Sequence, residues 1–181
     1  MPKQWDSSWT MARSAEEIEE AIQKLGREIS LDYVGRGPML LLTTARLSSV
    51  LFFFGALGRA VNPALPVQLG LVDILEEDGS RRLVYIDGVE KLVAGRHVIL
   101  ARPLMTTGET MQFIKQELER AGAKSVKTCV LLNKTWRESV IEPDYVGFQV
   151  TSSVYLAGYG LDDGTDRGRL LDHLIVSSEH K

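Results

Sequence analysis

The sequence lacks several features that mark particular protein classes. A single cysteine, Cys129, occurs among 181 residues, which excludes an internal disulfide and multi-cysteine metal motifs and suits a reducing compartment. Basic residues do not outnumber acidic ones, because the sequence has 21 Lys and Arg and 24 Asp and Glu. Proteins that bind nucleic acid or anionic membranes need a basic surface, so we expect neither partner here.

Long apolar runs are also missing. The longest, VLFFFGAL at residues 50–57, is far shorter than the ~20 residues that cross a bilayer. The first residues, MPKQWDSSWTMARS, contain no apolar signal core, so a cytoplasmic location is expected. We predict a loose leader over residues 1–13 and a single domain over 14–181, because no linker, repeat or low-complexity tract divides the chain.

What the sequence does contain is an alternation of apolar strands and helices. Helices are predicted at 15–30, at 46–61 and from about Gly108 to Gly122, and strands at 38–44, 66–74, 81–86, 96–101, 125–133, 145–150, 154–159 and 173–176. Ser14 and Glu17 have the spacing of a capping box. This alternation predicts an α/β domain with a mostly parallel central sheet flanked by helices. Ligands of such sheets bind beyond the carboxyl ends of the strands.

One strand-to-helix junction has the composition of a phosphate-binding turn. Residues 97–111 read HVILARPLMTTGETM, and Thr107, Gly108, Glu109 and Thr110 fall where the helix begins. Backbone N–H groups at a helix N-terminus favour an anion, and threonine hydroxyls add hydrogen-bond donors. A structural capping turn has the same composition, so this stretch alone leaves both interpretations open.

Longer segments carry a family resemblance. TGETMQFIKQELERAGAKSVKTCVLLNK, EPDYVGFQV and AGYGLD follow one another, and AEEIEEAIQKLGREISLDYVGR precedes them. Over roughly residues 14–178 the chain resembles hypoxanthine-guanine phosphoribosyltransferases. The resemblance implies the type I phosphoribosyltransferase fold and a purine base or purine 5′-mononucleotide as ligand. It implies Mg²⁺ only if transfer from phosphoribosyl diphosphate (PRPP) survives; otherwise no cofactor or metal site is expected.

The resemblance also assigns roles to residues. Lys134 matches the lysine that donates a hydrogen bond to the purine's six-position oxygen. Tyr145 matches the aromatic residue that stacks on the base, and Val146 matches the residue whose backbone contacts the edge of the base. Thr107, Gly108, Glu109 and Thr110 match the 5′-phosphate loop, and Arg169 matches an arginine near the pyrophosphate. A hydrogen-bond donor to the base, an aromatic ring that stacks on it and a turn that binds the phosphate are the minimum needed to bind a mononucleotide. Each residue alone would also suit a structural role.

The chain departs from the family where the chemistry occurs. Three positions that are acidic in the family hold Arg102, Pro103 and Thr106, and Ser152 or Ser153 stands where a carboxylate near the metal is expected. In the family the first two acids hold the ribose and support the Mg²⁺-bound donor, and the third accepts a proton. A positioned proton acceptor contributes ~10²–10⁴ in rate. Arg102 has the wrong sign beside a ribose that develops positive charge.

Two loops differ as well. Arg46, Leu47 and Ser48 occupy the places of the family's Leu-Lys-Gly pyrophosphate loop, and the Ser-Tyr-rich loop that closes over the active site is replaced by a shorter segment between Leu69 and Arg96. Arg46, Arg102 and Arg169 remain candidate anion contacts.

The departures favour a binding protein, a pseudoenzyme or regulator that holds a purine ligand without turning it over. The alternative is an active hypoxanthine/guanine phosphoribosyltransferase of purine salvage, which needs Arg46, Thr106 or the acids Asp162, Asp163 and Asp166 to supply the lost roles. A further alternative is a subunit that pairs through 46–61, as a homodimer or with a partner subunit.

A repurposed enzyme is the last alternative. It would use Arg102, Arg46, Lys134 and Trp136 around another ligand. No nucleophile–base pair supports it, because Cys129 is expected in the core and His97 and His173 at surface or structural positions.

Overall fold

The computed structural model describes residues 8–45, 49–135, 138–161 and 168–177. Its main sheet has six strands in the order β4-β3-β2-β5-β6-β7. These are β2 (Met39–Thr44), β3 (Val67–Glu77), β4 (Ser80–Tyr85), β5 (His97–Met105), β6 (Ser125–Lys134) and β7 (Tyr145–Val150). All neighbours in this sheet pair in parallel except β3 and β4. The predicted α/β fold with a mostly parallel sheet is therefore confirmed.

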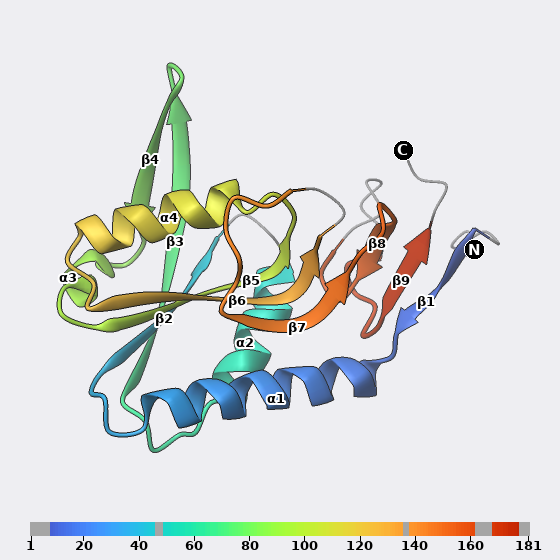
Figure 1. Ribbon diagram of the computed structural model, residues 1–181, viewed down its shortest axis with the longest axis horizontal. Helices are drawn as coiled ribbons and strands as arrows, with labels where there is room; N and C mark the ends of the chain where they lie inside the picture. The colour runs from blue at the N-terminus through green and yellow to red at the C-terminus, as the bar shows by residue number, and fades with distance from the viewer. Residues whose placement is uncertain (1–7, 46–48, 136–137, 162–167, 178–181) are drawn as a thin grey trace.

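Helices cover both faces of this sheet (Figure 1). They are α1 (Ala15–Tyr33), α2 (Ser49–Ala60), the short α3 (Glu90–Val93) and α4 (Glu109–Arg120). One apolar cluster joins α1 and α2 to the sheet through residues such as Ile22, Leu25 and Leu57. The other lies under α4, around Leu100 and Ile114. In the described part of the chain no helix has both the length and the apolar character needed to cross a bilayer.

The start of α1 agrees with the sequence. Glu17 N donates to Ser14 Oγ over 3.3 Å, and Ser14 N donates to Glu17 Oε2 over 2.8 Å, so the predicted capping box is present. The helix then extends to Tyr33, three residues beyond the predicted end.

The strand β5 is longer than predicted. It continues past residue 101 to Met105, because Arg102 pairs with Val130 and Leu104 with Leu132 of β6. Arg102 and Pro103 thus lie within a strand and not on the loop that follows it.

The segment between β3 and β5 contains a hairpin and a short helix. Asp78 and Gly79, both with positive φ, form the two-residue turn between β3 and β4, as expected for a type I′ hairpin. This turn lies between the strands predicted at 66–74 and 81–86, and the described residues between β3 and β5 form no long loop.

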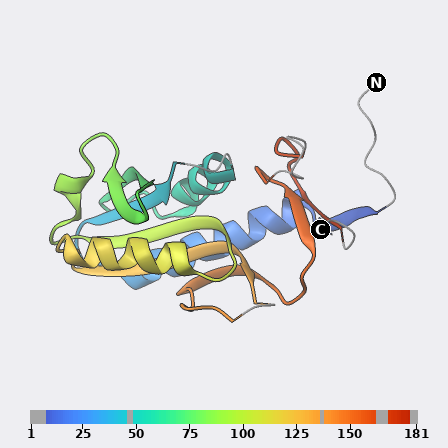
Figure 2. The ribbon, with the colours of Figure 1, turned by 90° about the horizontal axis from the view of Figure 1, so that it is seen from above.

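A second, antiparallel sheet of three strands has the order β1-β9-β8. Its strands are β1 (Trp9–Arg13), β8 (Tyr155–Gly158) and β9 (Leu174–Ser177). It stands beyond the carboxyl ends of β6 and β7 (Figure 2). The prediction of a loose leader over 1–13 is wrong for Trp9–Arg13, because their backbone groups pair with β9. Residues 1–7 lie outside the described part of the chain.

Candidate functional site

Most buried polar side-chain atoms without a hydrogen bond lie in the carboxyl-terminal halves of the parallel strands. Among the described residues these atoms are Thr43 Oγ1, Thr44 Oγ1, Arg102 Nε and both side-chain amide atoms of Asn133, on β2, β5 and β6. The exception is His97 Nε2, at the amino end of β5. Buried polar groups are almost always paired, so their concentration at this edge indicates that a ligand or water completes it.

The junction between β5 and α4 forms a cradle at this edge. Gly108 has φ 77° and caps α4 without a side-chain hydrogen bond. The preceding carbonyl, Thr107 O, accepts from Val140 N over 2.9 Å and from Ser139 Oγ over 3.1 Å. A Cβ at Gly108 would lie 2.6 Å from Ile141 Cγ2. The turn is thus fixed by residues 139–141, a contribution that the sequence analysis missed.

A cavity of about 200 Å³ opens at this cradle, lined by Arg102, Leu104 and residues 105–111. Burial lowers the pKa of the Arg102 guanidinium below its usual value, and no acidic group in the described part of the chain opposes this shift. Glu109 is exposed at the rim. Arg102 is partly buried and its Nε lacks a hydrogen-bond partner among the described residues, and the helix N-terminus adds a partial charge of the same sign. The cavity therefore suits an anion.

The predicted purine contacts do not all lie together. Lys134 ends β6 and its Nζ donates to Val154 O over 2.6 Å, next to Tyr155 of β8. Tyr145, however, begins β7 opposite Cys129, five residues before Lys134. At ~3.3 Å per residue this is about 16 Å away along the sheet.

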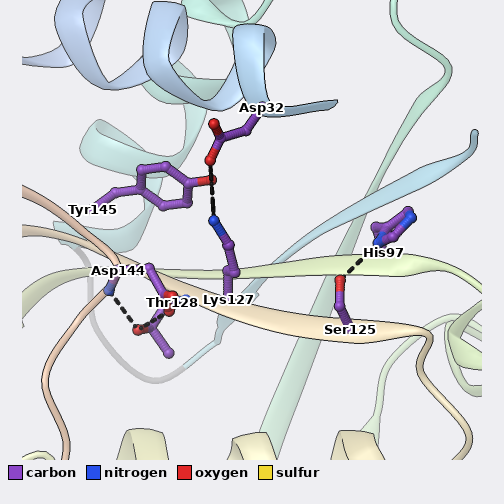
Figure 3. Close-up of polar contacts among 7 residues, drawn as sticks. All are labelled: Asp32, His97, Ser125, Lys127, Thr128, Asp144 and Tyr145. Carbon is purple, nitrogen blue, oxygen red and sulfur yellow. Dashed lines mark hydrogen bonds and ion pairs between the residues drawn. The ribbon is translucent and has the colours of Figure 1, made fainter. Parts of the chain in front are cut away.

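Tyr145 instead belongs to a polar cluster with α1 (Figure 3). Its hydroxyl donates to Asp32 Oδ2 over 2.6 Å, and Lys127 Nζ donates to the same oxygen over 3.0 Å. Burial, followed by this hydrogen bond, raises the pKa of Tyr145. Val146 pairs with Val130 and packs in the cluster under α4. The prediction that Tyr145 and Val146 flank the same base as Lys134 is therefore wrong.

Tyr155 is the aromatic residue that the sequence analysis missed. It directly follows Val154, and its ring lies edge-on to Trp9 with centroids 6.3 Å apart. The order of residues along the strands could have identified Tyr155. Parallel strands begin at one edge of the sheet and end at the other, so the first residue of β7 lies far from the last residue of β6.

The remaining candidates occupy varied places. Ser152 and Ser153 are exposed between β7 and β8, and Arg169 lies between β8 and β9, where its carbonyl accepts from Gly160 N over 2.8 Å. Cys129 is fully buried, as expected, and burial raises the pKa of its thiol. His97 is buried and contacts Ser125 Oγ over 2.7 Å.

Five candidates lie outside the described residues: Arg46, Trp136, Asp162, Asp163 and Asp166.

Two buried threonines differ in whether their hydroxyl is hydrogen-bonded. Thr43 Oγ1 has no partner among the residues that the structure describes, whereas Thr128 Oγ1 donates to Asp144 Oδ2 over 3.1 Å (Figure 3). We expect Thr43→Val to raise the free energy of unfolding by ~1 kcal/mol and Thr128→Val to lower it by ~1–3 kcal/mol, because only the second leaves a buried group unpaired. Urea unfolding of both variants measures the difference. Equal losses would show that Thr43 is satisfied in solution.

Comparisons with known proteins agree with the fold. The phosphoribosyl transferase domain model matches residues 8–163. The bifunctional protein TilS/HprT of Listeria innocua is 31% identical over 154 residues, which are 82% of this chain but only 23% of that protein's length. The hypoxanthine-guanine phosphoribosyltransferase of Aquifex aeolicus is 30% identical over 166 residues, 89% of this chain and 90% of that one.

A solved structure extends the similarity to nearly the whole chain. The hypoxanthine phosphoribosyltransferase of Trypanosoma cruzi superposes with a TM-score of 0.83 at 22% identity, covering 98% of both chains. This superposition supports the fold. The domain model and the sequence match to the Aquifex aeolicus enzyme show that the chain belongs to the hypoxanthine-guanine phosphoribosyltransferase family.

Proposed function

We propose that this protein binds a purine 5′-mononucleotide at the carboxyl edge of its main sheet and transfers phosphoribosyl groups poorly or not at all. The observation that carries the proposal is the partly buried Arg102 side chain, whose Nε lacks a partner among the described residues and which shares one cavity with the Gly108 turn. Family membership and the names of the relatives support a purine ligand.

The two ends of such a nucleotide would meet different groups. Thr107, Gly108 and Thr110 provide donors for the phosphate, and Glu109 is exposed at the rim of the same cavity. On the base side we propose Lys134 and Tyr155 in place of the earlier assignment to Tyr145. An ammonium has three donors, so Lys134 can keep Val154 O and still donate to a purine oxygen.

The residues at this edge do not fit Mg²⁺. Magnesium takes oxygen ligands in octahedral geometry, with carboxylates as its usual protein ligands. The positions that are acidic in the family hold Arg102, Pro103 and Thr106, and no group of three His, Cys, Asp or Glu gathers in the described part of the chain. The partly buried guanidinium of Arg102 would repel a second cation.

Calorimetry tests the binding proposal. Titrations with IMP, GMP, hypoxanthine and PRPP are expected to give heat with the two mononucleotides, and a Lys134→Met variant is expected to lose at least about tenfold in their affinity because a charged hydrogen bond is removed. Lys115→Met, a change of the same kind on α4, serves as the control. Absence of binding by all four compounds would refute the proposal.

The second candidate is an active hypoxanthine/guanine phosphoribosyltransferase, which the names of the relatives favour. It requires other residues to supply the acids, among them Asp162, Asp163 and Asp166.

We further propose a homodimer through α2 and β3, and a cytoplasmic location. Leu51 of α2 is 76% exposed and Leu69 of β3 is 55% exposed, and adjoining apolar residues such as Leu65 and Val67 line a cavity of about 200 Å³. Exposed apolar surface of this kind is typical of a protein interface.

A further inference from the structure

The main sheet ends on one side in a strand whose outer edge is unpaired. Among the described strands β7 pairs only with β6, and Val150 O accepts from Thr135 N, the residue that follows β6. Successive residues of a strand turn their backbone groups to opposite sides, so Gly147 and Gln149 direct theirs away from β6. No backbone group of the described residues bonds to them from that side. The edge is open to another strand.

The composition of β7 does not protect this edge. Edge strands of soluble proteins usually carry a charged side chain, a proline or a bulge that prevents further pairing. β4, the other edge of the sheet, has the exposed residues Arg81 and Arg82. The sequence of β7, YVGFQV, contains neither a charge nor a proline, and most of its residues are aromatic or β-branched, which favours strand pairing.

The helix α1 lies along β7 (Figure 1), and a groove of about 690 Å³ lies between them. Its lining comprises Gly147 and Phe148 of β7 and one side of α1 from Glu17 to Arg27. At ~1.5 Å per helical residue and ~3.3 Å per strand residue, this part of α1 spans ~15 Å and β7 spans ~17 Å. The helix side and the strand edge therefore form one surface of matching length.

The charges on this side of α1 change sign halfway along it. Glu17 and Glu20 precede Lys24 and Arg27, all four are exposed, and their spacing of three, four and three residues places them on one stripe of the helix. A twofold axis would set a second α1 antiparallel to the first, so that Glu20 faces the partner's Lys24. In the same arrangement Glu17 faces the partner's Arg27. The stripe is self-complementary, whereas a peptide of one charge sign would be repelled by half of it.

Contacts within the chain leave these charges available. Lys24 Nζ lies 3.8 Å from Glu28 Oε1, and an exposed pair of this kind contributes little. Within the described part of the chain, Glu20 and Arg27 form no ion pair. Glu19, which also lines the groove, accepts a hydrogen bond from the glutamine four residues later.

We propose that two copies of this chain join through β7 and the adjoining stripe of α1, which continues the six-stranded sheet across a twofold axis. The two β7 strands pair antiparallel, because an axis perpendicular to the sheet reverses strand direction. The backbone groups of Gly147 and Gln149 thereby gain partners, and the two α1 helices lie side by side on one face. This surface is separate from the one on α2 and β3, and it requires no ligand.

A proline variant tests the pairing of the strand edge. Gln149→Pro removes an N–H that points away from β6, so the fold keeps its own ladder while the edge loses a donor. Sedimentation equilibrium of the full chain is expected to show that this variant has half the mass of the wild-type assembly. Gln149→Thr, which keeps the N–H, is the matched control and is expected to retain the wild-type mass.

Exchange of charges tests the stripe on α1. Glu20→Lys and Lys24→Glu are each expected to weaken association by at least about tenfold, because each places two like-charged pairs across the axis. An equimolar mixture of the two variants is expected to regain the wild-type mass, since the mixed pair has opposite charges at both contacts. Mixing would not repair a folding defect. Arg82→Glu, on the other edge of the sheet, is the control for a change of charge.

The outcomes separate this interface from other modes of association. If the surface on α2 and β3 also pairs, wild type is a tetramer and the variants are dimers; if it does not, wild type is a dimer and the variants are monomers. In both cases a halved mass that the mixture restores upholds the proposal. Wild type that stays monomeric at about 100 μM, a concentration that would populate any interface of micromolar affinity, would overturn it. An assembly that neither Gln149→Pro nor the charge variants disrupt would overturn it too.

Discussion

Transfer from PRPP to hypoxanthine or guanine is expected to be at least about 100-fold slower with this protein than with a relative that retains the three acids. A positioned proton acceptor contributes ~10²–10⁴ in rate, and Thr106 cannot replace it because a hydroxyl is not a base at neutral pH. Arg102 adds a second penalty, since a partly buried cation destabilises a ribose that develops positive charge. Formation of IMP or GMP, followed by chromatography against a no-protein blank, measures the rate.

Restoring the acids provides the complementary test. The triple variant Arg102→Glu, Pro103→Asp, Thr106→Asp is expected to exceed wild type in transfer when Mg²⁺ is present. Arg82→Glu, on the exposed part of the β4 strand, is the control for the change of charge. Circular dichroism checks that the triple variant is folded. A wild-type rate equal to that of the relative would establish the second candidate function instead.

Gly26→Ala is expected to lower the free energy of unfolding by about 3 kcal/mol, at the upper end of the range for overpacked cores. Gly26 is where α1 crosses α2, and a Cβ there would lie 2.4 Å from Ala60 O and 2.6 Å from Ala60 Cβ. Since the obstacle is backbone, the helices must separate to make room. The same contact also positions Ser30, whose hydroxyl donates to Gly26 O and accepts from Asn62 N over 2.9 Å.

Gly55→Ala is the matched control, because it makes the same substitution inside α2. A Cβ at Gly55 would meet only Arg59 Nη1, at 3.6 Å. Alanine is the better helix former by up to ~1 kcal/mol, so this variant is expected to be as stable as wild type or more so. Urea unfolding of both variants gives the comparison. If Gly26→Ala were as stable as Gly55→Ala, the close approach of the two helices would be refuted.

The fold was predictable where the signal is local. The capping box at Ser14 and Glu17 and the Asp78-Gly79 turn depend on neighbours in sequence, and both are present. The end of β5 was not predictable in this way, because Pro103 is a poor strand residue and the strand continues there through the pairing of its neighbours Arg102 and Leu104 with β6. Tertiary pairing overrode local preference.

The site was predictable in part for a similar reason. Composition located the Gly108 turn, and the alternation of elements located the edge on which it lies. Tyr145 was assigned through the family resemblance of its segment, but its spatial separation from Lys134 depends on the register of β7 against β6. Likewise, residues 139–141 contact the turn from about thirty positions away, a separation that no local pattern records.

The strand β1 has a practical consequence for anyone who produces this protein. Translation initiated at Met11, an internal methionine, would remove Trp9 and Thr10, which pair with Ser177 and Val176. The truncated polypeptide would expose an unprotected β9 edge, and such edges recruit other chains. Preparations begun at the second methionine should therefore be prone to self-association, and the first ten codons should be kept.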